Sequence, residues 1–243
     1  MKENLLILLL NHEIPLLLHA GFLKSAPLMW AALGGAYSER SGVINIGLEG
    51  MMLIGAFAAA AGAWLTGNPW MGLALAGVSG CFAGLLHAWI CLYWRADQII
   101  SGMGINLMAM GLTGFLLFRI FNARGNSPEV PKLPSWQGDI EIPSWISNII
   151  FPLSVLHLLL ILILAGTLLI FYRTRFGLRL RACGENPNAA LSAGVKTNLY
   201  RYVAVGISGA MAGLGGAQLA ISDVSQFSTG MSNGRGFVAL AIL

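Results

Sequence analysis

The sequence predicts an all-α integral membrane protein, a polytopic bundle of about six complete spans followed by the start of a seventh. Hydrophobic residues make up 56% of the 243-residue chain and charged residues only 10%, whereas charged residues form about a quarter of an average soluble domain. Apolar runs of roughly 20 residues, long enough to cross the hydrocarbon core of a bilayer, recur along the chain. We therefore expect residues 1–243 to form a single transmembrane domain in a lipid bilayer.

Turn signals and interface residues separate the expected spans. The first contains Lys24, the second ends at the turn Gly67-Asn68-Pro69, and the third closes on Trp94 and Arg95, a pair typical of a membrane surface. The final apolar run is too short to cross a bilayer, so the chain is expected to be truncated within its seventh span. The expected spans are residues 15–37, 48–66, 70–94, 98–121, 153–172 and 202–222, with an incomplete span at 236–243.

Residues 173–201 form a strongly basic stretch that sets the expected orientation. Lys and Arg near the ends of spans resist translocation, so this loop should lie in the cytoplasm. The preceding loop, residues 122–152, carries one more acid than bases and is expected outside. The side of the N terminus stays open, because the apolar run at residues 4–10 can belong to a further crossing. The charged residues of the basic stretch are Arg173, Arg175, Arg179, Arg181, Lys196 and Arg201 against the single acid Glu185.

A short helix is expected inside this basic stretch. Asn186 is a suitable N-cap, Pro187 suits the first helical position, and Gly194 stops the run. A small, nearly uncharged helix on the cytoplasmic side can dock into a groove on a soluble partner. The alternative is a basic linker held near anionic lipid.

Residues 41–50, SGVINIGLEG, place polar groups where a span should start. Three glycines weaken a continuous helix here, and an interrupted helix at membrane depth needs protein or a water-filled cavity to satisfy its backbone. Broken helices of this kind form the pathways of many transporters. Asn45, Gly47, Glu49 and Gly50 are therefore candidate pathway residues. The alternative is a polar turn at the membrane surface, with Glu49 paired to Arg40.

Asn106 is the other candidate pathway residue. It lies about eight residues into its span, roughly 12 Å deep at about 1.5 Å per residue. Its amide can hydrogen-bond a sugar hydroxyl or a base edge, or it can join two helices. Elsewhere, glycines four residues apart, such as Gly80 with Gly84 and Gly209 with Gly213, predict close helix contacts.

Enzyme chemistry is not indicated by the sequence. The four histidines lack metal-ligand spacing, no GxxxxGK[ST] loop for ATP is present, and no GxSxG elbow occurs. The net charge of +4 comes from the basic stretch, so it describes topology and predicts no binding to nucleic acid. We expect neither a metal nor a cofactor.

Three sequence blocks resemble the permease subunits of bacterial nucleoside and simple-sugar ABC importers. They are ALGGAYSERSGVINIGLEGMMLIGAFAAA at residues 32–60, RTRFGLRLRACGENPNAALSAGV at 173–195 and NGRGFVALA at 233–241. The resemblance implies a multi-pass permease in the bacterial cytoplasmic membrane that translocates a nucleoside or simple sugar. The implied partners are separate ABC ATPase subunits, a second permease subunit, either identical or a paralogue, and an extracytoplasmic solute-binding protein.

Carried over by position, the resemblance assigns two groups of residues. Asn45, Gly47, Glu49 and Gly50 fall in the family signature at the second span. The residues that would form the coupling helix seated in the ATPase are Gly184, Glu185, Asn186, Pro187, Ala189, Ala190, Ala193 and Gly194.

Other functions remain open at this stage. An ion-coupled secondary transporter would use Glu49 or Lys24 as its titrating site. A structural membrane subunit would have no pathway. Permeases for branched-chain amino acids share the same architecture, so the solute class is also open.

Overall fold

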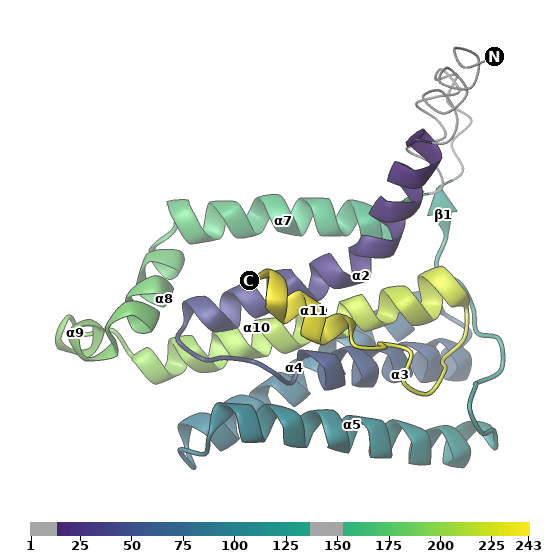
Figure 1. The fold of residues 1–243 in the computed structure, drawn as a ribbon, viewed down its shortest axis with the longest axis horizontal. Coiled ribbons are helices and arrows are strands. Elements are labelled where there is room, and N and C mark those ends of the chain that lie inside the picture. Colours follow the sequence, from purple (N-terminus) through teal and green to yellow (C-terminus); the bar gives the residue numbers. More distant parts are fainter. Residues whose placement is uncertain (1–13, 137–152) are drawn as a thin grey trace, which may run out of the picture.

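A computed structural model describes residues 14–136 and 153–243, and in these residues the protein is almost entirely helical (Figure 1). The predicted all-α class is confirmed. The one sheet in this part of the chain is a pair of two-residue antiparallel strands, β1 and β2, with Ser135 opposite Ser154. The elements are α2 (Ile14–Arg40), α3 (Leu48–Thr66), α4 (Pro69–Leu92), α5 (Gln98–Phe121), β1 (Ser135–Trp136), β2 (Leu153–Ser154), α7 (Val155–Arg173), α8 (Arg175–Glu185), α9 (Pro187–Ser192), α10 (Thr197–Ala217), η2 (Gln218–Val224) and α11 (Arg235–Ile242).

Five helices in the described residues are long and apolar enough to cross a membrane. They are α3, α4, α5, α7 and the continuous unit of α10 and the π-helical η2. The first expected span corresponds to the 27-residue α2, which contains Lys24 and is not among the five. Helix α11 occupies the position of the expected seventh span. The protein is therefore a multi-pass membrane protein with at least five apolar helices.

Local signals explain where these helices begin and end. Asn68 caps α4 by accepting a hydrogen bond from the Trp70 backbone at 2.9 Å, and Gly67 takes the left-handed conformation that ends α3. Asp97 caps α5 by accepting from Ile99 and Ile100 at 2.8 and 3.1 Å. Helices α3 and α5 cover the same residues as two of the expected spans, 48–66 and 98–121.

The bundle has an inner pair of helices and an outer layer. In the apolar window of each helix, 83% of the residues of α10–η2 and 72% of those of α3 are buried, against 28% for both α5 and α7. Glycines make the close inner packing possible. A Cβ on Gly209 or Gly213 of α10 would overlap a backbone carbonyl of α4. The close contact predicted from these glycines is therefore present.

Polar side chains inside the bundle are hydrogen-bonded to one another. The Trp30 indole donates to Gln218 at 2.9 Å, and the Gln218 amide lies 3.0 Å from a ring nitrogen of His157. The other ring nitrogen of His157 lies 2.8 Å from the Ser154 hydroxyl. This series of hydrogen bonds joins α2, η2 and the start of α7. In the interior of the bundle, unsatisfied polar groups would be costly.

The basic stretch contains more helix than its sequence suggested. We expected one short helix, but residues 175–185 form the separate helix α8, and α10 already begins at Thr197. Thr174 caps α8 by accepting from Gly177 at 3.2 Å, and Leu180 and Cys183 are buried on one face. A capped amphipathic helix among arginines is easy to overlook, because its apolar positions are few.

The acidic loop lies only partly within the described residues. Its first part runs beside η2, with Val130 and Leu133 donating backbone hydrogen bonds of 2.9 Å to Ser225 and Ile221. The remainder of the expected loop, residues 137–152, lies outside the described residues. In Figure 1, residues 122–136 are at one end of the bundle, and α8 and α9 are at the other.

Candidate translocation site

The segment at residues 41–47 is a non-helical connection packed inside the bundle. Figure 1 shows it running from the end of α2 back toward the middle of the bundle, where α3 begins. The buried Asn45 amide donates to the Ser208 hydroxyl of α10 at 3.0 Å, and its carbonyl oxygen accepts from Gly47 at 3.1 Å. The interrupted helix expected here therefore has its backbone satisfied by protein groups.

Asn106 joins this segment to α5. Its amide nitrogen donates to the Ile46 carbonyl at 3.0 Å, and its amide oxygen accepts from the Gly50 backbone at 2.8 Å. Glycine is needed at position 50, because an added Cβ would lie 2.9 Å from the Asn106 Cα. Asn106 thus has the helix-joining role that was one of its two predicted alternatives, and it also caps the start of α3.

Glu49 connects the start of α3 to the start of α11. One carboxylate oxygen accepts from the Gly234 backbone at 2.8 Å and the other accepts from Gly236 at 2.7 Å. The carboxylate therefore lies at the N-terminal end of α11, where the helix dipole favours negative charge. These partners differ from Arg40, the partner in the surface-turn alternative.

A cavity of about 420 Å³ opens beside these groups. Of the five predicted pathway residues, Glu49, Gly50 and Asn106 line the cavity, while Asn45 and Gly47 lie behind it in the supporting segment. Its volume falls within the range of small-molecule sites. The full lining is Glu49, Gly50, Leu53, Met103, Asn106, Leu107, Met110, Gly230, Ser232, Asn233, Gly234 and Phe237.

One wall of the cavity, formed by residues just before α11, was not predicted from the sequence. Ser232 is 98% buried yet its hydroxyl makes no hydrogen bond to the described residues, and Asn233 is exposed. Phe237 also lines the cavity and is 48% exposed. The NGRG sequence was a usable signal, because two glycines beside an Asn favour a turn that brings polar groups near a helix start.

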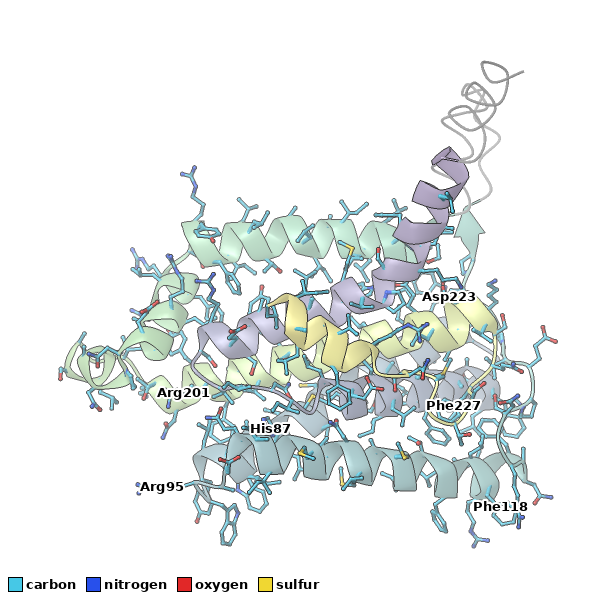
Figure 2. The ribbon with its side chains drawn as sticks, viewed as in Figure 1. His87, Arg95, Phe118, Arg201, Asp223 and Phe227 are labelled. Carbon is cyan, nitrogen blue, oxygen red and sulfur yellow. The ribbon has the colours of Figure 1, made fainter. Side chains whose placement is uncertain are left out.

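Lys24 lies in a different cavity, of about 200 Å³, together with Lys132 and Asp223. This cavity shares no lining residue with the one beside Glu49. Figure 2 shows Asp223 at the end of the bundle opposite Arg201. Glu49 and Lys24, the alternative titrating sites for ion coupling, therefore line separate cavities.

The predicted coupling residues form an exposed corner of the protein. Helix α9 has the expected cap, with Asn186 accepting from Ala189 at 3.0 Å, and Gly194 has φ +79°. Ala190 is the buried residue of α9, whereas Leu191 is 54% exposed. Gly184 and Glu185 belong instead to the end of α8.

Comparison with known proteins gives the family. A family model described as a branched-chain amino acid transport system permease component matches residues 17–243. The guanosine ABC transporter permease protein NupQ of Bacillus subtilis is 37% identical over 95% of this chain and 75% of its own length. The nucleoside ABC transporter permease protein NupC of Lactococcus lactis is 37% identical, covering 90% and 71% of the two chains. The putative glucose ABC transporter permease protein TsgC13 of Haloferax volcanii is 32% identical, covering 93% and 69%.

Further matches bear on the organisation of such systems. A second guanosine permease of the same Bacillus subtilis strain, NupP, also matches this chain, at 27% identity over 89% of it. Among solved structures, none matches this chain. The coverage of the family model and the identity to full-length permeases both exceed what chance similarity gives. The chain therefore belongs to the family of branched-chain amino acid transport system permease components and is a membrane permease subunit of the ABC importer type.

Proposed function

We propose that this permease passes a nucleoside across the bacterial cytoplasmic membrane, with the cavity beside Asn106 forming part of its pathway. ATP hydrolysis takes place on separate ATPase subunits, and a second permease subunit and an extracytoplasmic solute-binding protein complete the system. The support is that three residues singled out from sequence line one cavity at the starts of two helices. A simple sugar is the next solute class to test, in view of the similarity to TsgC13.

The observation that carries the solute class is the position of Glu49. Helix starts carry partial positive charge and attract anionic groups such as the carboxylate of an amino acid. At this cavity, Glu49 already occupies the start of α11 with both carboxylate oxygens. A further carboxylate would meet a negative charge there. The site therefore favours an uncharged solute over a branched-chain amino acid.

The walls of the cavity favour a solute with one flat apolar face. Leu53, Met103, Leu107 and Phe237 provide apolar surface, and a half-exposed aromatic ring can stack on a base. Ser232 offers a hydroxyl with free hydrogen-bonding capacity. A nucleoside presents a base to the apolar wall and ribose hydroxyls to the polar groups. A hexose has no face of comparable apolar area.

The coupling proposal rests on α9. The helix is held by its own caps, exposes Leu191, and lies at the opposite end of the bundle from residues 122–136. With the basic residues around it placed in the cytoplasm, α9 is available to an ATPase groove. Residues 184–194 then carry ATPase movement into the bundle.

The test of solute class is uptake into proteoliposomes that contain the permease pair and the ATPases, with binding protein added outside. We expect labelled guanosine uptake to be inhibited by excess nucleosides and not by leucine. Phe237→Ala should lower the uptake roughly 5- to 150-fold if stacking contributes about 1–3 kcal/mol. The control is Phe115→Ala, which removes a ring that is 61% exposed on α5 and outside the cavity lining. Leucine transport, or equal effects of the two variants, would refute the proposal.

The coupling assignment needs its own experiment. Glu185→Ala and Gly194→Ala should reduce co-purification of the ATPase and uptake together. Binding of solute to the separately purified binding protein should not change. Normal ATPase association in both variants, with normal uptake, would remove residues 184–194 from the coupling role.

A further inference from the structure

The contact between the coupling region and the 41–47 segment is made by Arg201, near the start of α10. The side chain donates from Nε to the Ser41 carbonyl at 3.1 Å and from Nη2 to the Cys183 carbonyl at 3.2 Å. Ser41 follows the end of α2, and Cys183 is in the last turn of α8. Figure 2 shows Arg201 at the end of the bundle where α8 meets α10. One guanidinium therefore joins two chain segments to α10.

The chemistry of this contact suits arginine in particular. Both acceptors lie at the C-terminal ends of helices, where unpaired carbonyls carry partial negative charge. A guanidinium is planar and presents several N–H donors in a fixed geometry, so it can hold two carbonyls at a set separation. A lysine would keep the positive charge but not the fixed geometry.

Two glycines bring the backbones together beside Arg201. A Cβ on Gly184 would lie 2.5 Å from the Arg40 carbonyl oxygen and 3.3 Å from the Gly42 nitrogen. Gly42 has φ +82°, which other residues rarely adopt, and an added Cβ would lie 3.2 Å from Gly184. The end of α8 is thus in direct backbone contact with the start of the 41–47 segment. Because the two backbones are in contact here, a movement of α8 toward the 41–47 segment would displace that segment.

The 41–47 segment then leads directly to the cavity. Its far end is held by Asn45 to α10 and by Asn106 to α5, and Asn106 lines the cavity. The middle of the segment is held at Ile44. Its backbone nitrogen donates a hydrogen bond to the Gln98 side-chain oxygen at 2.7 Å, and its carbonyl oxygen lies 3.2 Å from a ring nitrogen of His87. Every step from α8 to Asn106 is a hydrogen bond or a backbone contact.

We propose that Arg201 is the positioning residue that transmits movement of the coupling helices to the cavity, through the 41–47 segment. The proposal rests on the coupling role given above to residues 184–194. Arg201 does not line the cavity. It sets how far the 41–47 segment follows when α8 and α9 are displaced.

The experiment compares Arg201→Met and Arg201→Lys in the complete reconstituted transporter, with Arg179→Met as the matched control. Arg179 also joins α8 to α10, through a 3.0 Å hydrogen bond to the Tyr200 hydroxyl, but it is exposed and does not contact residues 41–47. Four quantities are measured: ATPase co-purification, basal ATP hydrolysis, stimulation of hydrolysis by loaded binding protein, and solute taken up per ATP.

We expect Arg201→Met to keep co-purification and basal hydrolysis while uptake per ATP falls about tenfold or more, within the usual range of coupling between two sites. Stimulation by loaded binding protein should be lost as well. Arg201→Lys should lie between this variant and the wild type, and Arg179→Met should stay within about twofold of the wild type.

Three outcomes would overturn the inference. Normal uptake per ATP in Arg201→Met would show that movement does not pass through this residue. Equal losses in the Arg201 and Arg179 variants would indicate a general requirement for α8–α10 contacts. If Arg201→Met does not fold, the Arg201→Lys variant is used instead. Normal stimulation of its ATP hydrolysis by loaded binding protein would show that the fixed geometry of the Arg201 guanidinium is not required. Failure of the underlying coupling assignment would be seen separately, as normal ATPase association in Glu185→Ala and Gly194→Ala.

Discussion

The two regions that the sequence singled out are built in opposite ways. The 41–50 region is buried, and its shape depends on side chains from α5 and α10 that are remote in sequence, such as Asn106 and Ser208. Helix α9 is exposed, and its shape depends on its neighbours in sequence, with Asn186 and Gly194 at its ends. Residues 41–50 are therefore held by tertiary contacts, whereas α9 is held by contacts within its own segment.

This difference separates two mechanical requirements of a coupled permease. A cavity wall that must hold a solute benefits from groups fixed by several tertiary hydrogen bonds. A helix that must enter another protein benefits from being ordered locally while its surface stays free. Changes in the first region should therefore affect stability and transport together. Changes in the second should affect partner binding and leave the stability of the isolated permease almost unchanged.

The largest expected effect is that of Asn106→Leu. The substitution leaves the Gly50 N–H and the Ile46 carbonyl without their partner, which should cost about 1–4 kcal/mol of unfolding free energy. Uptake should be abolished, because the start of α3 is no longer held against α5. Thermal unfolding of the purified permease and proteoliposome uptake measure the two effects. The control Met110→Leu changes another cavity residue with similar volume and should be mild. An Asn106→Leu variant as stable as the wild type would contradict the claim that tertiary hydrogen bonds hold the 41–50 region in place.

Gly50→Ala should have the next largest effect. The added methyl group would lie 2.9 Å from the Asn106 Cα and the Ile105 carbonyl oxygen, so α3 and α5 must separate at a cost of about 1–3 kcal/mol. Gly104→Ala is the matched control, because a Cβ there meets nothing within 4 Å. That change should stabilise the helix slightly or leave it unchanged. The same unfolding assay compares the pair, and equal effects would show that the close approach is not required.

Sequence patterns predicted the features that depend on nearby residues. The N-cap and stop of α9 were predicted from Asn186 and Gly194, and the expected span 98–121 has the same bounds as α5. The polar positions Glu49 and Asn106 were recognised because an apolar run makes a polar group conspicuous. Their shared cavity agrees with that expectation, although their role in transport stays a prediction.

The unpredicted features depend on contacts between distant segments. Glu49 binds the backbone near Gly234, and no local pattern indicates a partner 185 residues away. The cavity wall at Ser232 and the contact of Arg201 with Ser41 are of the same kind. Helix α8 was missed for another reason, since three of its 11 residues are arginines, which makes the segment polar on average.

Asn186→Ala tests the locally built region with a smaller expected effect. Loss of the cap should destabilise α9 by about 0.5–2 kcal/mol. The midpoint of global unfolding should not move, because α9 buries only Ala190. ATPase co-purification should fall several-fold, since a frayed helix must be ordered on binding. Asn188→Ala, a change at an exposed neighbouring position, is the control. A lowered global unfolding midpoint in Asn186→Ala would show that α9 is part of the folded core.

Gly194→Ala should give the smallest effect, and a pair of substitutions at this position identifies its cause. Gly194 has φ +79° and an added Cβ meets nothing within 4 Å, so the cost comes from the backbone conformation alone, about 1 kcal/mol. Asparagine tolerates this conformation better than alanine, so Gly194→Asn should retain more ATPase association than Gly194→Ala. Equal losses in both variants would mean that the ATPase contacts position 194 directly and cannot accept any side chain there. A smaller loss of ATPase association in Gly194→Asn than in Gly194→Ala would show that the backbone conformation of the turn that ends α9 is what matters. The shape of this region would then be set by its own local sequence.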